Sequence, residues 1–446
     1  MCVDFGSTFT KAALVDLTEG RLLATAEHPT TSATDVLVGW EACREQLAVV
    51  DPAAANAEVL ACSSAGGGLR IAVVGNERLV TAEAGRRVAL SSGGRVVHVS
   101  AGPLPDPAEL REARPDVLLL VGGTDGGNSE VLLACATALA ESGWPGPVVV
   151  AGNVEAHDEV TGILAGAGTP YVVADNVVPQ IGVLRPGSAR RAIREMFLEH
   201  VIGGKHLSAR AEFVEMVRGA TPDVVLGAVE LLGRGVPDQG LRGVGDVVVV
   251  DVGGATTDVY SVVEPVEGAD ESGLSQDVIA VPPVNRTVEG DLGVRWSAVP
   301  TVEAAVDAGF LEGGESASLR AGAEVRQGDP DHLPGDDADV ALDGRLVSWA
   351  AGVALRRHAG RGRGERRGVD LREAVLLVGS GGALRHAPAA EALLTAHVTT
   401  QGGWLVPEHP RVVVDTDYVL AAAGLLAEVH PVVAYQLLEP LRASGG

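Results

Sequence analysis

The sequence of 446 residues has few lysines, few aromatic residues, no cysteine pair and no long apolar run. Its four cysteines are Cys2, Cys43, Cys62 and Cys135. They lie far apart and form no C-x-x-C pair, which argues against a zinc ribbon, a local metal cluster and a disulfide framework. The longest apolar runs fall far short of the ~20 residues that a membrane span needs. Only two lysines occur, Lys11 and Lys205, so each is a candidate for a role that needs a compact positive charge.

The charge balance limits the partners of the chain. Its 34 basic and 59 acidic residues give a net charge of −25, which repels phosphate backbones and anionic lipid. We therefore expect no nucleic-acid partner and no membrane partner. Because an acidic residue and a glycine turn arrive by positions 4 and 6, we expect no signal peptide and a cytoplasmic protein. Any bound nucleotide must be held by local backbone amides and a metal ion, and the histidines show no metal-ligand spacing.

The chain alternates short β-branched runs with helical stretches, which is typical of an α/β fold. We predict a first domain over 1–185, a helical connecting segment over 186–244 and a second domain over 245–446. The acidic, Gly- and Pro-rich segment 312–340 and the basic segment 358–368 are predicted to be solvent-exposed loops.

An internal repeat is the main organisational feature. Residues 2–17 read "CVDFGSTFTKAALVDL" and residues 249–264 read "VVDVGGATTDVYSVVE". Each copy has an apolar strand that ends in Asp, a turn rich in glycine and hydroxyl groups, and a second apolar strand. Two copies, each at the start of a predicted domain, indicate two similar domains that face one cleft.

The first copy places phosphate-binding groups around one turn. A strand ends at Asp4, and the turn that follows offers backbone N–H groups and hydroxyls. The turn residues are Gly6, Ser7 and Thr8. Lys11 begins the returning strand and can add a positive charge beside the same phosphates. Alone, this pattern is a weak signal, because most such hairpins are only turns.

The second copy strengthens the prediction. Asp251 again ends a strand, and the turn that follows contains Gly253, Gly254, Ala255 and Thr256. Asp4 and Asp251 together can hold a hydrated Mg²⁺, which keeps several waters and needs few protein ligands. Thr256 can contact a γ-phosphate, and Asp258 can orient or deprotonate an attacking water.

A third Gly-rich turn follows the apolar run "AVLLVG" and consists of Gly379, Ser380, Gly381 and Gly382. A turn between a strand and a helix N-terminus lets adenosine and its phosphates lie against the backbone. The chain completes neither G-x-G-x-x-G nor G-x-x-x-x-G-K-[ST], so the dinucleotide-binding and P-loop interpretations lose their main support.

In this order, "DFGSTFTK", "DVGGATTDV" and "VGSGG" resemble the phosphate-1, phosphate-2 and adenosine motifs of the actin, sugar-kinase and Hsp70 ATPase superfamily. The resemblance implies two actin-like ATPase (ribonuclease H-like) domains, with mixed sheets flanked by helices, that face one nucleotide cleft. It also implies ATP or ADP with Mg²⁺ as cofactors. Asp4 and Asp251 would lie near the Mg²⁺ waters, both hairpin turns and Lys11 would bind phosphates, and the third turn would bind adenosine.

Five further stretches together resemble the glutamate mutase L (GlmL/MutL) family. These are "DVLLLVGGTDGGNSE", "VVVAGNVEAHDEV", "DNVVPQIGVL", "SARRAIREMF" and "NRTVEGDLGVRWSA". Members are accessory proteins of the adenosylcobalamin-dependent methylaspartate (glutamate) mutase. The resemblance implies a Mg²⁺-dependent ATPase with a chaperone-like role, which reactivates the mutase subunits by exchanging damaged cobalamin for intact cofactor. A small-molecule kinase and a noncatalytic nucleotide-binding scaffold are the alternatives, and an oligomer is left open.

Two local features have open interpretations. The turn 122–130 either binds an anion with Asp125 and Asn128 facing the cleft, or lets Asn128 or Ser129 cap the helix that follows. Three residues precede Asp4, whereas members of the superfamily have several more. We therefore expect either a short first strand or a start codon placed late.

Overall fold

The structure is a computed structural model of the chain. It describes residues 1–102, 107–264, 281–311, 314–330, 332–361, 368–398, 400 and 402–443. The chain forms two compact units. The first contains Met1–Asp16 and Leu22–Leu226, and the second contains Leu17–Arg21, Gly227–Pro265 and Pro283–Gly446. The division falls inside helix α8 (Thr221–Arg234).

The first unit contains a mixed five-stranded sheet in the order β10-β4-β1-β2-β3. Its strands are β1 (Cys2–Phe5), β2 (Phe9–Asp16), β3 (Arg21–Pro29), β4 (Leu60–Ser63) and β10 (Val217–Ala220). β1 and β2 form an antiparallel hairpin, and β4 runs parallel to β1. In this register Asp4 lies opposite Lys11 on one side and Cys62 on the other.

The second unit repeats this plan in a sheet of order β15-β14-β13-β16-β17. Its strands are β13 (Val247–Val252), β14 (Thr257–Val262), β15 (Val284–Glu289), β16 (Leu376–Ser380) and β17 (Arg411–Val414). β13 and β14 form the antiparallel hairpin, and β16 runs parallel to β13. Asp251 lies opposite Asp258 and Ser380. The two like sheets confirm the predicted α/β fold with mixed sheets and the repeat seen in the sequence.

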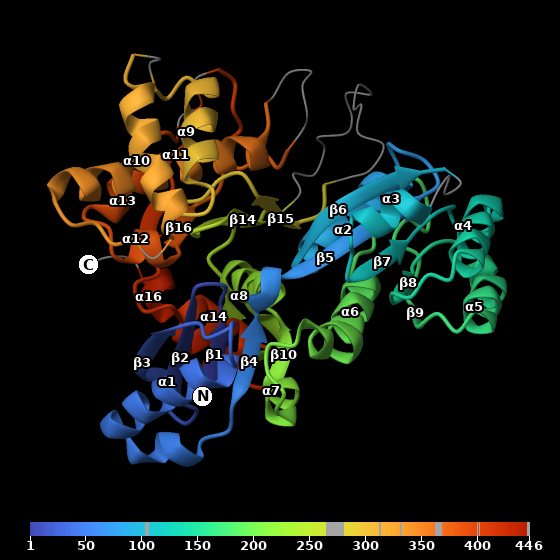
Figure 1. Cartoon of the computed structure of the whole chain (residues 1–446), viewed down its shortest axis with the longest axis horizontal. Coiled ribbons are helices and arrows are strands. Elements are labelled where there is room, and N and C mark those ends of the chain that lie inside the picture. The colour runs from blue at the N-terminus through green and yellow to red at the C-terminus, as the bar shows by residue number, and fades with distance from the viewer. Residues whose placement is uncertain are drawn as a thin grey trace. The chain divides into compact units, whose positions relative to one another are not determined.

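A third sheet, all parallel, lies within the first unit in the order β6-β5-β7-β8-β9 (Figure 1). Its strands are β5 (Leu69–Gly75), β6 (Gly94–Ala101), β7 (Val117–Leu120), β8 (Val148–Val150) and β9 (Tyr171–Val173). Alternate residues enter two separate apolar cores: Val73 and Leu119 face one, and Val74 and Leu120 the other. A parallel sheet buried on both faces explains the uninterrupted apolar runs of this region.

Helices cover both faces of this parallel sheet. They are α2 (Thr81–Ser91) and α6 (Gly187–Met196) on one face, and α4 (Glu130–Glu141) and α5 (His157–Gly166) on the other. α4 and α5 lie side by side (Figure 1). The short helix α3 (Pro107–Glu112) precedes β7. The sequence predicts most of these strands but not that they form a sheet of their own.

The remaining helices of the first unit are α1 (Val36–Val50) and α7 (Ala211–Met216). Those of the second unit are α9 (Ala298–Asp307), α10 (Ser316–Gly328), α11 (Asp337–Ala359), α12 (Gly382–Arg385), α13 (Ala390–Thr395), α14 (Val419–Leu426), α15 (Pro431–Leu437) and α16 (Glu439–Arg442). The prediction of a loop over 312–340 is wrong, because α10 and the start of α11 occupy most of it. Of the predicted loop over 358–368, residues 362–367 lie outside the described residues.

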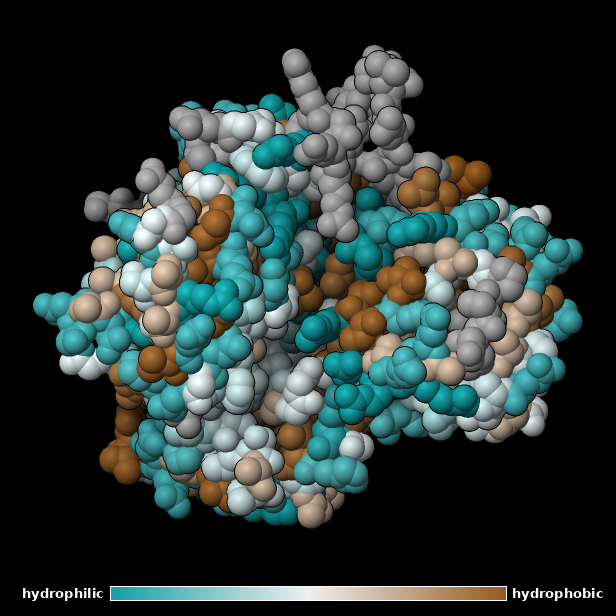
Figure 2. Space-filling model, turned by 45° about the horizontal axis from the view of Figure 1, so that its top comes forward, coloured by the Kyte–Doolittle hydropathy of each residue, from teal (hydrophilic) through white to brown (hydrophobic). Residues whose placement is uncertain are grey.

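The surface in view is largely hydrophilic. In Figure 2 hydrophilic residues cover most of the visible face, and hydrophobic residues occur in small separate groups. In the part of the chain that the structure describes, no helix is long and apolar enough to cross a membrane. All four cysteines are buried thiols that form no disulfide.

Candidate functional site

The phosphate-1 turn, residues 6–8, is held from behind by Thr30. The Thr30 hydroxyl donates to the Gly6 carbonyl at 2.8 Å, and the Thr30 backbone N–H donates to the Thr8 carbonyl at 2.8 Å. In a trans peptide the C=O and the N–H that follows it point in opposite directions. The N–H groups of Ser7 and Phe9 therefore point away from Thr30, an arrangement suited to binding an anion.

Asp4 lies at the base of this turn and is only 4% exposed. Its carboxylate accepts hydrogen bonds from the Thr221 hydroxyl at 2.6 Å and from the Cys62 thiol at 3.6 Å. Burial, together with the neighbouring Asp4 charge, raises the pKa of the Cys62 thiol well above its ordinary value, so the thiol remains a neutral donor. Thr221 begins α8 and fixes the carboxylate, a role that sequence reasoning did not assign.

The phosphate-2 turn, residues 253–256, is held in the same way by the segment 293–297. Val294 N–H donates to the Gly253 carbonyl at 3.1 Å, and Arg295 N–H to the Gly254 carbonyl at 2.9 Å. The Ser297 hydroxyl donates to the Ala255 carbonyl at 2.6 Å. With all three carbonyls turned toward this segment, the next three N–H groups, of Gly254, Ala255 and Thr256, point away from it. They form a second potential anion-binding turn.

Close packing fixes the position of the segment 293–297. A Cβ atom at Gly293 would lie 2.5 Å from the Gly254 carbonyl oxygen, so only glycine allows the two backbones to approach this closely. The buried Thr301 hydroxyl accepts a hydrogen bond from Gly293 N–H at 2.9 Å. The sequence stretch "EGDLGVRWS" therefore supports the phosphate-2 turn from behind, a function that its residue types alone do not indicate.

Asp258, across the hairpin from Asp251, is paired with a buried arginine. Arg286 donates from Nε at 2.8 Å and from Nη2 at 2.5 Å to Asp258 Oδ1, and the Thr256 hydroxyl donates to Oδ2 at 3.3 Å. Removing a proton from water would place a neutral acid against this guanidinium and break a buried charge pair. The arrangement therefore favours orienting a water over deprotonating it.

The ion pair between Arg286 and Asp258 predicts a stability effect. Replacing Arg286 with glutamine leaves the Asp258 carboxylate without its buried partner, and we expect a loss of about 3 kcal/mol in the free energy of unfolding. Arg372→Gln is the matched control, because Arg372 pairs with Asp370 at the exposed surface, and its loss should stay below about 1 kcal/mol. Urea unfolding followed by circular dichroism measures both, and equal losses would show that the Arg286 pair is not structural.

Of the predicted adenosine turn, residues 379–382, Gly379 and Ser380 end strand β16 and only Gly381 separates them from α12. The segment lies directly beside Asp251, because β16 is the parallel neighbour of β13. Gly381 has φ +96°, and a Cβ atom there would lie 2.7 Å from Asp251 Oδ1 and 2.3 Å from the Val252 carbonyl oxygen. α12 starts at Gly382. A cavity of about 290 Å³ lies beyond this helix and is lined by Leu384, Arg385, Ala387, Ala389, Ala390, Glu391, Val414 and Thr416. In the second unit, the structure thus brings Asp251 together with the adenosine turn.

In the turn 122–130, Asp125 is exposed but makes hydrogen bonds to two neighbouring segments. Asp125 Oδ1 accepts hydrogen bonds from Asn176 Nδ2 at 2.8 Å and from Val154 N–H at 3.3 Å. Ser129 occupies the N-cap position of α4, but its side chain makes no capping hydrogen bond. The contacts of Asp125 link three of the stretches that carry the family resemblance, and a ligand at this turn stays a prediction.

The carboxylates of Asp4 and Asp251 are hard oxygen donors of the kind that Mg²⁺ binds directly or through water. Among the described residues, no group of three or more His, Cys, Asp or Glu side chains could hold a metal ion by itself. Each carboxylate, Asp4 in the first unit and Asp251 in the second, is by its chemistry a fitting ligand for a Mg²⁺ that keeps most of its waters.

Comparison with solved structures gives distant likenesses. The nucleotide-free structure of acetone carboxylase is 16% identical in sequence, and the alignment covers 95% of this chain and 69% of that chain, with a TM-score of 0.41. The ROK hexokinase of Thermus thermophilus is 14% identical, covers 95% of both chains and has a TM-score of 0.29. The ethanolamine utilization protein EutJ of Carboxydothermus hydrogenoformans is 10% identical, covers 97% of this chain and 88% of its own, and has a TM-score of 0.31. The strand order of the two mixed sheets, rather than these likenesses, defines the fold.

Comparison of sequences is more informative. The family model described as MutL protein matches residues 1–441. Protein MutL of Clostridium tetanomorphum is 34% identical over 458 residues, which cover 98% of this chain and 98% of that protein. Matched over almost its whole length by both, the chain belongs to the MutL protein family.

Proposed function

We propose that the chain binds and slowly hydrolyses MgATP, and that it serves an adenosylcobalamin-dependent glutamate (methylaspartate) mutase as an accessory protein. In this role it reactivates or assembles the mutase by nucleotide-driven domain motion and cofactor exchange. The observation that carries the nucleotide proposal is the contact between Asp251 and Gly381 in the second unit. It supports the proposal because Asp251 and the two Gly-rich turns, residues 253–256 and 379–382, lie at the ends of two neighbouring strands.

Each part has a defined role in the proposal. The outward N–H groups of Gly254, Ala255 and Thr256 bind the γ-phosphate oxygens, and the phosphate-1 turn and Lys11 bind the β- and γ-phosphates. Asp4 and Asp251 hold the waters of Mg²⁺, which neutralises charge on the phosphates when bound. Asp258, fixed by Arg286, orients the attacking water together with Thr256.

The nucleoside end has a candidate position in the second unit. The cavity beside α12 is lined in part by residues that follow the adenosine turn in the sequence, and its lining is both apolar and polar, including Leu384, Arg385 and Thr416. Its volume of about 290 Å³ is at the lower limit of small-molecule pockets. We propose that the adenine ring enters this cavity.

Membership of the MutL protein family supports the mutase as partner. A kinase would need a free base for the hydroxyl of its substrate, whereas Asp258 is engaged by Arg286 and Thr256. The pairing therefore favours slow hydrolysis over rapid phosphoryl transfer to a small molecule.

The role is tested with a mutase that has been inactivated by cyanocobalamin. We expect mutase activity to return when the chain, ATP, Mg²⁺ and fresh adenosylcobalamin are all present. Activity should not return when ATP is replaced by a non-hydrolysable analogue, because the proposed motion depends on hydrolysis. If the complete mixture restores no activity, the reactivation role is wrong. That result would not contradict nucleotide binding, which is tested by titration of MgATP.

A further inference from the structure

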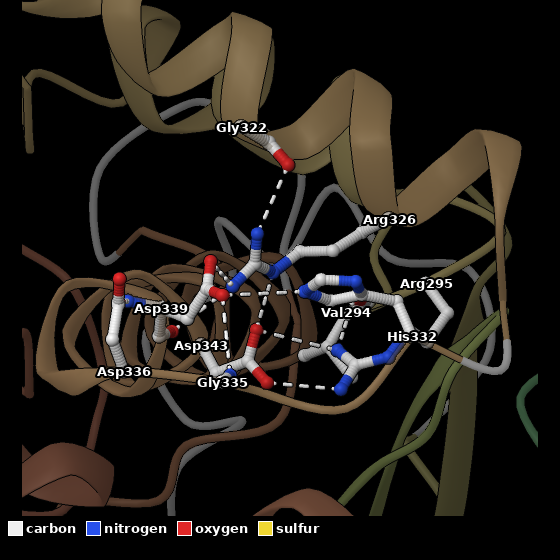
Figure 3. A network of polar contacts seen from close by, with 9 residues as sticks. All are labelled: Val294, Arg295, Gly322, Arg326, His332, Gly335, Asp336, Asp339 and Asp343. Carbon is white, nitrogen blue, oxygen red and sulfur yellow. Dashed lines mark hydrogen bonds and ion pairs between the residues drawn. The ribbon is translucent and has the colours of Figure 1, made fainter.

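The segment behind the phosphate-2 turn is joined to two helices by a network of charged side chains (Figure 3). Arg295 belongs to this network through both its backbone and its side chain. Its backbone N–H holds the Gly254 carbonyl, and its side chain donates from Nη2 to Asp343 Oδ2 at 2.9 Å. Its Cβ and Cγ atoms also lie closest to Gly254, 3.5 and 3.7 Å from where a Cβ atom would stand. If the phosphate-2 turn moves, Arg295 alone can therefore transmit the movement to Asp343 of α11.

Asp343 binds a second guanidinium on its other side. Arg326 of α10 donates from Nε to Asp343 Oδ1 at 2.5 Å, and from Nη2 to the carbonyl and the carboxylate of Asp339 at 3.0 and 3.1 Å. Its Nη1 donates to the Gly322 carbonyl at 3.1 Å. Asp343 thus lies between the arginine that holds the phosphate-2 turn and an arginine that anchors α10 (Figure 3).

α10 packs mainly against α9 and buries few side chains of its own. Only two of its residues are buried, Ala323 and Arg326, and Arg326 is 1% exposed. Buried ion pairs add little net stability, but they demand a specific geometry. Because Arg326 is one of only two buried side chains of α10, the helix is sensitive to small movements of the carboxylate that this arginine binds.

We propose that Asp343 is a positioning residue that couples occupancy of the phosphate-2 turn to the packing of α10. The inference rests on the proposed MgATP site. A γ-phosphate on the outward N–H groups fixes the turn, Arg295 holds Asp343, and Asp343 holds Arg326 and α10. After hydrolysis the turn loses this ligand, and the coupling releases α10. Because such coupling is reciprocal, the network in turn raises the affinity of the turn for ATP relative to ADP.

The test compares Asp343→Asn with the wild-type full chain. We expect the affinity for a non-hydrolysable MgATP analogue to fall about tenfold, within the usual range of coupling between sites. The affinity for MgADP should change by less than about twofold, because ADP has no γ-phosphate to hold the turn. A merely structural role would lower both affinities or neither, so the ratio of the two affinities is the informative measurement.

Hydrogen exchange gives a second readout at α10 itself. In the wild type, the amides of α10 should be better protected with the MgATP analogue than with MgADP. In Asp343→Asn this difference should disappear. Arg320→Gln is the matched control, because Arg320 lies on the same helix but pairs with Glu303 at the surface. It should keep both the affinity ratio and the difference in protection.

Trp296 reports on the turn from within the same segment. It is 56% exposed and lies between Arg295 and Ser297, both of which bond to the turn. The MgATP analogue should change the fluorescence emission of Trp296. The part of the emission change that is lost in Trp296→Phe comes from this residue. In Asp343→Asn the emission change should shrink together with the affinity for the analogue.

The outcomes separate the coupling from the site. If Asp343→Asn keeps the wild-type affinity ratio and the protection difference at α10, the coupling is wrong and the ATP site stands. If the wild-type chain binds no MgATP analogue, the proposed function and the coupling are both wrong. Should Asp343→Asn fail to fold, Arg295→Lys takes its place. It keeps the charge but loses the planar guanidinium fork, and an unchanged affinity ratio would again overturn the coupling.

Discussion

Replacing Asp251 with asparagine is expected to lower the rate of MgATP hydrolysis about 100-fold or more while leaving the fold intact. The substitution keeps the shape of the side chain but removes the negative charge that holds the Mg²⁺ waters. The hairpin itself is retained, because β13 pairs with β14 and β16 through backbone hydrogen bonds. Release of inorganic phosphate measures the rate, and circular dichroism with thermal unfolding measures the fold.

The matched control for this substitution is Asp246→Asn. Asp246 directly precedes β13, at the opposite end from Asp251, and accepts a hydrogen bond from Glu264 N–H at 3.0 Å. It bears the same chemical change far from the phosphate-2 turn, so its hydrolysis rate should match the wild type. Hydrolysis retained in Asp251→Asn would contradict the assignment of Asp251 to the nucleotide site.

Gly381→Ala is expected to weaken binding of a MgATP analogue by at least about tenfold and to destabilise the second unit by about 1–3 kcal/mol. The added Cβ atom would lie 2.3 Å from the Val252 carbonyl oxygen and 2.7 Å from Asp251 Oδ1. Both β13 and the Asp251 carboxylate must move to accept it. Calorimetric titration of the analogue measures the affinity, and thermal unfolding measures the stability.

Gly309→Ala is the control that separates the two effects of Gly381→Ala, the steric clash of the added Cβ atom and the backbone strain at positive φ. Gly309 has φ +71°, so alanine is strained there as well, but no atom lies within 4 Å of the added Cβ. We expect a stability loss of about 1 kcal/mol and an unchanged affinity. If Gly381→Ala binds the analogue as tightly as Gly309→Ala does, the contact between the adenosine turn and Asp251 has no role in nucleotide binding.

The hairpins could be predicted from the sequence because their signal is local. An apolar strand, an Asp and a glycine turn follow one another within a few residues, as in Asp4 with Gly6 and Asp251 with Gly253. The local repeat predicts two similar domains, and the resemblance to the superfamily implies their mixed sheets, which the structure confirms.

The supports of the turns could not be predicted, because they come from distant segments with no periodic pattern. Thr30 lies 24 residues after Gly6, and Thr221 lies 217 residues after Asp4. A single threonine hydroxyl is common in any sequence, and only the folded chain shows which carbonyl or carboxylate it binds. The same holds for Arg295, which contributes through its backbone as well as its side chain.

The prediction at α10 failed because overall composition was given more weight than local helix propensity. The segment 312–340 is acidic and rich in Gly and Pro, which favours a loop. The part that forms α10, "SASLRAGAEVRQG", consists mainly of residues with good helix propensity. Its buried Arg326 gives no apolar stripe, so the periodicity that normally identifies a packed helix is absent.

Equilibrium titration of MgATP into the wild-type chain by calorimetry tests the central claim most directly. The account predicts one MgATP bound per chain, with an affinity that falls when EDTA removes Mg²⁺ and falls again in both Asp4→Asn and Asp251→Asn. Absence of binding, or an affinity that neither EDTA nor these two substitutions change, would contradict it.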